Sequence, residues 1–156
     1  MENIHLNRKT VLLLSCLREN ARETLTDISK KTKIPISTLF DLLKELSGNL
    51  ITKSTVLMDF SKLGYHTRAQ LILKVEKEQK EKLKQHLYFH PNVNSIYKIN
   101  NGYDFMIETV HKNIKELDLF LEQLQQKFNI SDPQIHYLID EVKKEGFTLN
   151  APNVNL

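Results

Sequence analysis

The sequence is poor in cysteine and has no long apolar run, and each absence excludes a class of protein. Its one cysteine, Cys16, cannot form a disulfide within the chain, and its leucine neighbours favour a core position over a nucleophile. Apolar runs such as residues 11–14 are far shorter than a membrane span. The first residues carry charge and no apolar segment with a cleavage site. We therefore expect no signal peptide and a cytoplasmic protein.

Motifs of common enzyme and metal sites are also absent. There is no P-loop, no dinucleotide-binding glycine pattern, no Ser/His/Asp arrangement and no pair of carboxylates in a recognisable cleft. We therefore predict no catalytic residues, no cofactor and no enzyme. His86 and His90 have the spacing of a metal pair on one helical face. However, Pro91 follows His90 and ends the helix, and no third ligand is recognisable, so we predict no metal site.

The composition is that of a globular protein with an uneven distribution of charge. The 156 residues are 40% hydrophobic and 26% charged, which suits one ordinary domain or two small ones. Residues 1–66 hold 10 basic and 7 acidic residues, whereas residues 67–156 hold 12 of each. The whole net charge of +3 therefore lies in the first part of the chain.

The first part predicts three short helices. Residues 9–20 place apolar side chains on one helical face, Thr26 is predicted to N-cap a second helix, and Pro35 suits the first turn of a third. The third helix lies in IPISTLFDLLKEL, residues 34–46, and Gly48 can end it in a left-handed turn. Two short helices joined by a tight turn are typical of a helix-turn-helix. The core-facing stripe of the third helix is Leu39, Leu42, Leu43 and Leu46.

The second part predicts an α+β module after a linker. Residues 50–60 are rich in β-branched side chains and predict a strand, and SKLGYHT forms a short hinge with the domain boundary near Gly64. The domains are therefore expected at residues 1–64 and 65–156. Alternating and helical patterns then predict the order β-α-β-β-α-β of a ferredoxin-like module. The strands are expected at 68–75, 92–99, 104–110 and 134–142, and the helices at 76–90 and 112–128. The helical stripe of the second helix is Ile114, Leu117, Leu121, Leu124 and Phe128.

One face of such a sheet carries both helices and the other face is open. Four apolar side chains, Ile72, Tyr97, Ile99 and Tyr137, are candidates for that open face. An exposed apolar face of this size is typically covered by another subunit. The sequence therefore predicts self-association.

The order of these parts resembles the Lrp/AsnC family of transcription regulators over roughly residues 8–146. DFSKLGY is similar to that family's linker, NNGYDFMIETV to its Gly-x-x-Asp hairpin, and HPNVNSIYKI to the strand before it. The resemblance implies a winged-type helix-turn-helix joined by a strand or hinge to a ferredoxin-like module. It also implies a DNA-binding dimer that often assembles to octamers. In many members the module binds an amino acid near the hairpin at a subunit interface, which here points to Asn101, Gly102, Tyr103 and Asp104.

Contact with double-stranded DNA needs cations for phosphates and polar groups for base edges. Lys30, Lys31 and Lys33 precede the third helix and suit the DNA backbone, and Lys53 is a wing-like contact. On the helix itself the candidates are Ser37, Thr38, Asp41 and Lys44.

The third helix and the turn before it depart from the pattern of the Lrp/AsnC family that the chain resembles. Asp41, Leu42 and Glu45 stand where relatives commonly have arginine, Lys33 replaces the turn glycine, and Pro35 replaces the Ser or Thr cap. From residue 26 to 46, four lysines oppose three acids, which predicts weak non-specific DNA binding with a shallow salt dependence.

Two functions therefore stay open. The first is a DNA-binding transcription regulator that responds to an amino acid or another small molecule. The second is an oligomeric ligand-sensing or protein-interaction module whose helix-turn-helix binds DNA weakly or not at all. Equally, NNGYD can be a plain β-turn without a ligand.

Overall fold

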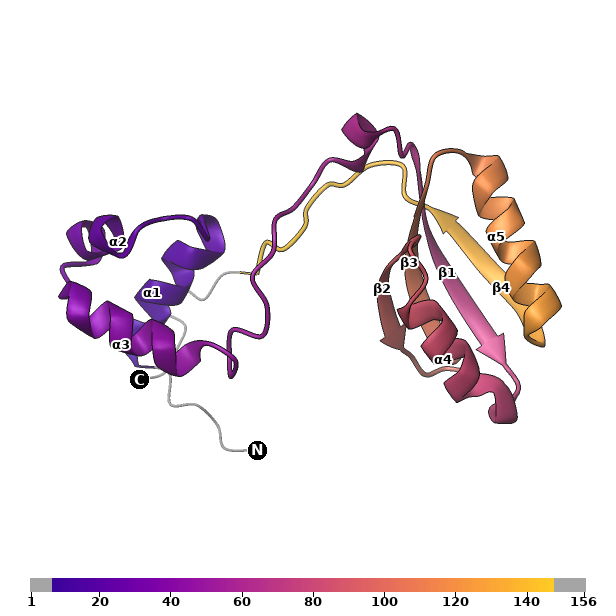
Figure 1. Cartoon of the computed structure of the whole chain (residues 1–156), viewed down its shortest axis with the longest axis horizontal. Coiled ribbons are helices and arrows are strands. Elements are labelled where there is room, and N and C mark those ends of the chain that lie inside the picture. Colours follow the sequence, from indigo (N-terminus) through magenta and orange to yellow (C-terminus); the bar gives the residue numbers. More distant parts are fainter. Residues whose placement is uncertain (1–6, 148–156) are drawn as a thin grey trace. The chain divides into compact units, whose positions relative to one another are not determined.

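The computed structural model describes residues 7–147, which form two compact units (Figure 1). The first unit holds the described residues 7–57 and 143–147, and the second holds residues 58–142. Segment 143–147 joins the first unit through Arg18, whose guanidinium donates to the carbonyl oxygens of Glu145 and Phe147 at 2.8 and 3.2 Å. The domain boundary at Gly64 stays a prediction.

The first unit contains three helices around a small core. These are α1 (Arg8–Glu19), α2 (Leu25–Thr32) and α3 (Ile36–Leu46), so the three predicted helices are confirmed. The Asn7 side chain caps α1 by accepting from the Thr10 N–H at 2.9 Å. Gly48 has a φ of 77°, which fits the left-handed turn predicted after α3. The buried core is Leu13, Leu14, Ile28, Ile34, Leu39 and Leu46.

The predicted N-cap of α2 is wrong by two residues. Thr24, not Thr26, is the cap: its hydroxyl accepts from the Asp27 N–H at 3.1 Å and donates to the Asp27 carboxylate at 2.7 Å. Threonine is a favoured cap, and an acid in the first turn is favourable at the positive end of the helix dipole. The Asp27 position therefore selects Thr24 over Thr26 as the start of the helix.

The strand predicted for residues 50–60 is also wrong in the described chain. Only an isolated bridge between Ser47 and Ile51 forms there, and residues 52–59 have no regular secondary structure. A strand is stable only with a hydrogen-bonded neighbour, and no described strand pairs with this segment. Its apolar side chains Val56, Leu57 and Met58 are exposed as a result. The segment ends in a 3-10 turn, η1 (Phe60–Leu63), closed by Gly64 with φ 84°.

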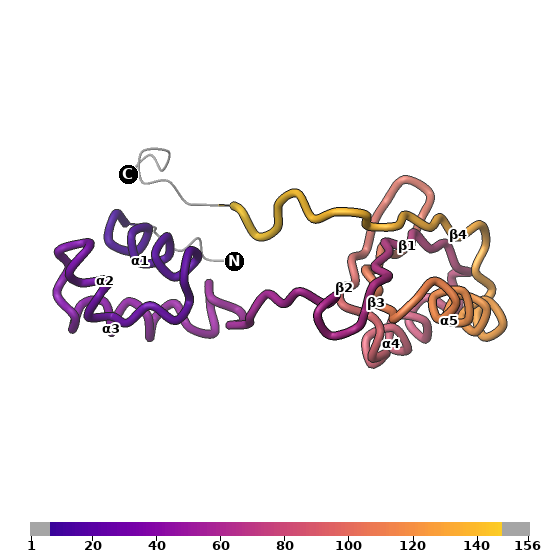
Figure 2. Tube along the Cα trace, turned by 90° about the horizontal axis from the view of Figure 1, so that it is seen from above, coloured from indigo at the N-terminus to yellow at the C-terminus, as the bar shows by residue number. Residues whose placement is uncertain are grey.

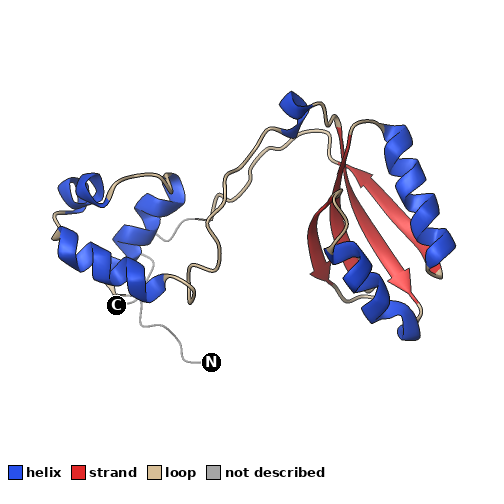
Figure 3. Cartoon of the chain, in the orientation of Figure 1, coloured by secondary structure: helices blue, strands red, loops and turns tan. Residues whose placement is uncertain are grey.

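The second unit is a four-stranded antiparallel sheet with two helices on one side (Figures 2 and 3). The strands are β1 (Thr67–Val75), β2 (Val93–Lys98), β3 (Phe105–His111) and β4 (Ile130–Tyr137), in the spatial order β2-β3-β1-β4. The helices are α4 (Lys80–Tyr88), which follows the short turn η2 (Lys77–Gln79), and α5 (Ile114–Lys127). This is the ferredoxin-like β-α-β-β-α-β arrangement that the sequence predicts.

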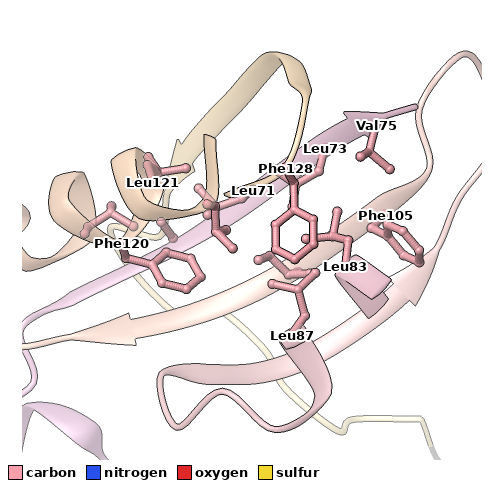
Figure 4. Packing of buried hydrophobic residues seen from close by; sticks show 13 residues of the cluster. Leu71, Leu73, Val75, Leu83, Leu87, Phe105, Phe120, Leu121 and Phe128 are labelled. Atoms are coloured by element: carbon pink, nitrogen blue, oxygen red, sulfur yellow. The ribbon is translucent and has the colours of Figure 1, made fainter. Parts of the chain in front are cut away.

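Alternation along β1 builds the core between sheet and helices (Figure 4). Every second residue from Thr67 to Val75 is buried, whereas the residues between them are more exposed. Leucines of α4 and apolar side chains of α5 pack onto this face. The cluster includes Leu71, Leu73, Leu83, Leu87, Phe105, Phe120, Leu121 and Phe128.

Three details of the sheet differ from the sequence prediction. The last strand covers residues 130–137 rather than 134–142, because it tolerates Pro133 at an irregular step on the sheet edge. Ile114 is 55% exposed and does not belong to the buried stripe of α5. Tyr137 is paired with Ala69, so it lies on the helix side of the sheet and not on the open face.

The open face of the sheet, which carries no helix, has apolar side chains and an ion pair next to each other. Ile72 lies opposite Met106, and Tyr97 is 53% exposed on the same face. Beside them, the Arg68 guanidinium donates to the Glu108 carboxylate at 2.8 Å and lies 5.7 Å from the centre of the Phe60 ring. This face is therefore a mixed surface, with half-buried apolar side chains on the central strands and the exposed Tyr97 on the edge strand β2.

Candidate functional site

The turn between α2 and α3 is fixed by local hydrogen bonds. Lys33 ends α2 in the left-handed conformation, with φ 61° and ψ 22°, which is the position where related turns commonly have glycine. The Ser29 hydroxyl donates to the Ile34 carbonyl at 2.6 Å and the Thr32 hydroxyl donates to the Ile28 carbonyl at 2.7 Å. The first bond ties the residue before Pro35 to α2, and the second lies within the last turn of α2.

The start of α3 leaves backbone donors available. Pro35 occupies the N-cap position, and no described side chain caps the helix there. The first N–H groups of a helix have no partner inside it, so they face the solvent at the end where the helix dipole is positive. This end of α3 therefore suits a phosphate group.

Four side chains of α3 project from one exposed face. Ser37, Phe40, Asp41 and Lys44 occur at i, i+3, i+4 and i+7, opposite the buried Leu39 and Leu46. Of the predicted contact residues, Ser37, Asp41 and Lys44 thus lie together on the outward face. Thr38 is half-buried on its flank.

Two of the predicted lysines are engaged by acidic side chains of their own unit. The Lys31 ammonium pairs with Glu23, whose side chain is only 8% exposed. The hydrogen bond that Lys31 donates to the Glu23 carboxylate raises the pKa of Lys31. Lys30 pairs with Asp27 at 3.2 Å, an exposed i,i+3 pair. The Thr24 hydroxyl first, and Lys30 second, hold the pKa of Asp27 below its usual value.

These pairs differ in how easily they open. An exposed lysine–carboxylate pair contributes little to stability, so Lys30 can leave Asp27 for a phosphate at small cost. Lys31 neutralises a largely buried carboxylate and is held more firmly. Lys33 and Lys53 are exposed, and Lys53 lies in the segment without regular structure rather than on a wing strand.

Sequence reasoning missed two residues of α3. Phe40 is 59% exposed and Ile36 is 46% exposed, and both lie outside the core of the first unit. The available signal was helical spacing, because Phe40 falls between Ser37 and Lys44 on the polar face rather than on the leucine stripe.

The hairpin between β2 and β3 holds the four predicted effector residues. Asn101 and Gly102 turn the chain with φ values of 63° and 86°, and both are exposed. Two consecutive positive φ values are typical of the tight turns that join antiparallel strands. Tyr103 and Asp104 are half-buried, and the Tyr103 hydroxyl accepts from the Gln134 side chain.

Asp104 is bonded inside the unit at both carboxylate oxygens. One oxygen accepts from the Val75 N–H at 3.0 Å, and the other pairs with the Lys80 ammonium. Burial alone would raise the pKa of Asp104, but the hydrogen bonds from Lys80 and Val75 outweigh it and hold the pKa below its usual value. The carboxylate thus ties the hairpin to the end of β1 and to the start of α4.

Three of the five histidines of the second unit, His86, His90 and His111, lie around Phe120 and Phe128. His90 and His111 contact the Phe120 ring at centroid distances of 4.7 and 5.3 Å, and His86 contacts Phe128 at 5.4 Å. Burial lowers the pKa of all three imidazoles. Within residues 7–147, no group of three or more potential ligands is arranged to hold a metal ion. In the same residues, no helix combines the length and the apolar character needed to cross a membrane.

Family models match both parts of the chain. Residues 68–146 match the Lrp/AsnC ligand binding domain, which is just over half of the chain. Residues 8–49 match the IclR helix-turn-helix domain. The first match covers the ferredoxin-like unit and the second covers α1 to α3.

Two relatives that this chain resembles over most of its length are described as HTH-type transcriptional regulators. An uncharacterised HTH-type transcriptional regulator of Pyrococcus furiosus is 24% identical over 150 residues, which cover 96% of this chain and 99% of the relative. The HTH-type transcriptional regulator FL11 of Pyrococcus horikoshii is 27% identical over 111 residues, 70% of this chain and 74% of the relative.

Solved structures share the fold. LrpC of Bacillus subtilis superposes with a TM-score of 0.81 at 17% identity, covering 90% of this chain and 99% of that one. A transcriptional regulator of Neisseria meningitidis, solved as a complex with L-Met, gives a TM-score of 0.84 at 17% identity, covering 93% of this chain and 96% of that one.

Proposed function

Because the chain belongs to the Lrp/AsnC family of transcription regulators, we propose that it binds double-stranded DNA sequence-specifically through α2, the turn and α3. The carrying observation is the outward face of α3, where Ser37, Asp41 and Lys44 stand together without a described partner. In helix-turn-helix proteins the second helix of the motif enters the major groove with its N-terminal residues against the bases. The protein acts in the cytoplasm as a dimer or a larger homo-oligomer.

The roles of the side chains follow from their positions. Lys33, at the turn, and Lys30, in its weak exposed pair, contact phosphates on either side of the α3 N-terminus. Ser37 and Lys44 offer hydrogen-bond donors to base edges, and Asp41 accepts from a cytosine amino group. Thr38 and Lys53 contact the DNA backbone at the edge of this surface. Lys31 contributes least, because it is held by Glu23.

Fluorescence anisotropy with a labelled duplex from the gene's own promoter tests this proposal. We expect Lys30→Glu and Lys44→Glu each to weaken binding at least tenfold, since each replaces a cation near DNA by an anion. Lys82→Glu, an equal charge change at an exposed position of α4, is the matched control and leaves affinity nearly unchanged. If neither Lys30→Glu nor Lys44→Glu weakens binding, another surface of the protein contacts DNA.

We further propose that the hairpin residues Asn101, Gly102, Tyr103 and Asp104 bind an amino acid where subunits meet. Support comes from the exposed, positive-φ turn and from the fold shared with the Neisseria regulator solved with L-Met. The negative charge of Asp104 is neutralised by Lys80, so Asp104 holds the hairpin in place rather than pairing with the ligand. Ligand contacts therefore come chiefly from backbone groups and Asn101. Isothermal titration against the standard amino acids tests this site, and no heat with any of them would contradict it.

A second candidate function keeps the assembly and loses the DNA contact. It is favoured by Asp41 and Glu45, which place negative charge on or beside the outward face of α3, and by the pairing of Lys31. In that case the protein is an oligomeric ligand-sensing or protein-interaction module. The promoter titration above separates the two, because this candidate predicts weak binding or none, with no further loss from Lys30→Glu or Lys44→Glu.

A further inference from the structure

The outward face of α3 is unusual for an exposed helix surface because it carries an aromatic ring. Phe40 is 59% exposed, and Ile36, one turn before it, is 46% exposed. A single exposed apolar side chain is common, but an amphipathic helix ordinarily has polar residues on its solvent face. Together the two form a small apolar patch directly beside Ser37 and Lys44.

The patch is not explained by packing within the unit. The core formed with α1 and α2 uses Leu39 and Leu46 of α3, with Leu42 and Leu43 packed against it, and includes neither Phe40 nor Ile36. The two side chains are thus available to an outside partner.

The chemistry of the major groove offers one apolar group to such a patch. Base edges there present hydrogen-bond donors and acceptors, except for the C5-methyl group of thymine, which phenylalanine and other apolar side chains contact. Ile36 and Phe40 lie in the first turns of α3, which is the part of a recognition helix that meets the bases. The surrounding field is only weakly positive, so apolar contact carries a larger share of discrimination here than in arginine-rich helices.

We infer that Phe40 and Ile36 are specificity-determining residues that contact thymine methyl groups in the major groove. This inference rests on the proposed DNA binding and deepens it. Asp41 and Ser37 then add the hydrogen bonds that fix the register beside these thymines. Phosphate contacts by the lysines are independent of the methyl groups, so non-specific affinity does not depend on Phe40.

Replacing thymine by uracil deletes only the methyl group and provides a direct test. Duplexes are first selected from a random-sequence pool with the full chain, and a selected duplex is then synthesised with uracil at each thymine position in turn. We expect one or two positions at which uracil weakens binding about fourfold, the effect of exposing roughly one buried methyl group. Compared with the unaltered chain, Phe40→Ala is expected to bind the thymine duplex about fourfold more weakly and the uracil duplex with the same affinity.

Phe89→Ala is the matched control, because Phe89 is 81% exposed but follows α4 in the other unit. It should leave the thymine–uracil difference intact. If the full chain selects no duplex, the proposed function fails and this inference with it. If it binds selected duplexes but uracil costs nothing at any position, DNA binding stands and the inference is overturned.

Two further outcomes also overturn it. If Phe40→Ala weakens binding to thymine and uracil duplexes equally, the ring contacts the sugar–phosphate backbone instead. If sedimentation without DNA shows that Phe40→Ala lowers the oligomeric state, the patch is a contact between copies of the chain.

Discussion

The outward face of α3 and the β2–β3 hairpin contain similar polar residues and use them in opposite ways. On α3, Asp41 and Lys44 stand without a described partner. At the hairpin, Asp104 and Lys80 bond each other, and Asp104 also accepts from the Val75 backbone. An aspartate near a lysine therefore supports the fold in one region and is free for a ligand in the other. The difference lies in whether the chain itself supplies the partner.

The largest expected effect concerns the salt dependence of α3 binding to DNA. With Lys31 held by Glu23 and two acids on or beside the outward face of the helix, we expect fewer than about six phosphates neutralised per dimer. Affinity should then fall by less than about a thousandfold between 50 and 200 mM salt. Anisotropy titrations across this range measure the slope of log K against log salt. A slope that implies more than about six phosphates would contradict the weak field assigned to α3.

Exchanging one carboxylate for an amide in each region tests the comparison directly. Asp104→Asn replaces an anion bonded to Lys80 and Val75, so we expect a loss of about 1–3 kcal/mol in the free energy of unfolding. Asp41→Asn is the matched change at an unbonded position and should alter stability by less than about 0.5 kcal/mol. Urea unfolding followed by circular dichroism measures both. Equal losses would mean that Asp104 is no more structural than Asp41.

The sequence predicted the parts of this contrast that depend on local pattern. Alternation along residues 67–75 and the leucine spacing of α3 depend on neighbours in sequence, so the sheet, the helices and the family were predictable. The ion pair between Lys80 and Asp104 joins positions far apart in sequence, and no sequence pattern predicts it. Phe40 was missed because an apolar residue within a leucine-rich helix is ordinarily assigned to the core.

The sequence prediction failed where a segment prefers a strand but has no neighbouring strand, and where two residues suit the same position equally well. Residues 50–60 have strand-forming side chains, but strand formation also requires a neighbouring strand that no described segment provides. Thr24 and Thr26 are both acceptable caps by type, and only the bond to Asp27 distinguishes them. Tyr137 was assigned to the open face because the sequence alone does not give the register of β4 against β1, which pairs Tyr137 with the buried Ala69.

The two units should also respond differently to moderate acid. Burial lowers the pKa of His86, His90 and His111 below the ordinary value near 6.5, so the folded second unit binds fewer protons than its unfolded chain. Its stability is therefore fully present above about pH 6.5 and falls as the pH drops towards the folded pKa values. Nearby Glu116 favours protonated His111 and Lys127 disfavours protonated His86, and burial outweighs the former.

Residues 7–57 and 143–147 contain no histidine, so the first unit should not lose stability in this range. Hydrogen exchange with mass spectrometry at pH 7.5 and 5.5, corrected for the intrinsic exchange rate, reports each unit separately. His111→Gln should reduce the loss in the second unit, because it removes a buried group that must be charged on unfolding. Equal loss of protection in both units would contradict the assignment.

The smallest expected effect is at the turn that aims α3. Lys33 holds a left-handed conformation that glycine adopts without steric cost, so Lys33→Gly should stabilise the first unit by about 0.5–1 kcal/mol relative to Lys33→Ala. Both substitutions remove the same charge, so both should weaken DNA binding alike if Lys33 contacts a phosphate. Thermal unfolding gives the first quantity and anisotropy gives the second. If Gly and Ala instead differ in DNA affinity but not in stability, the conformation of the turn, and not the charge of Lys33, would govern how α3 meets DNA.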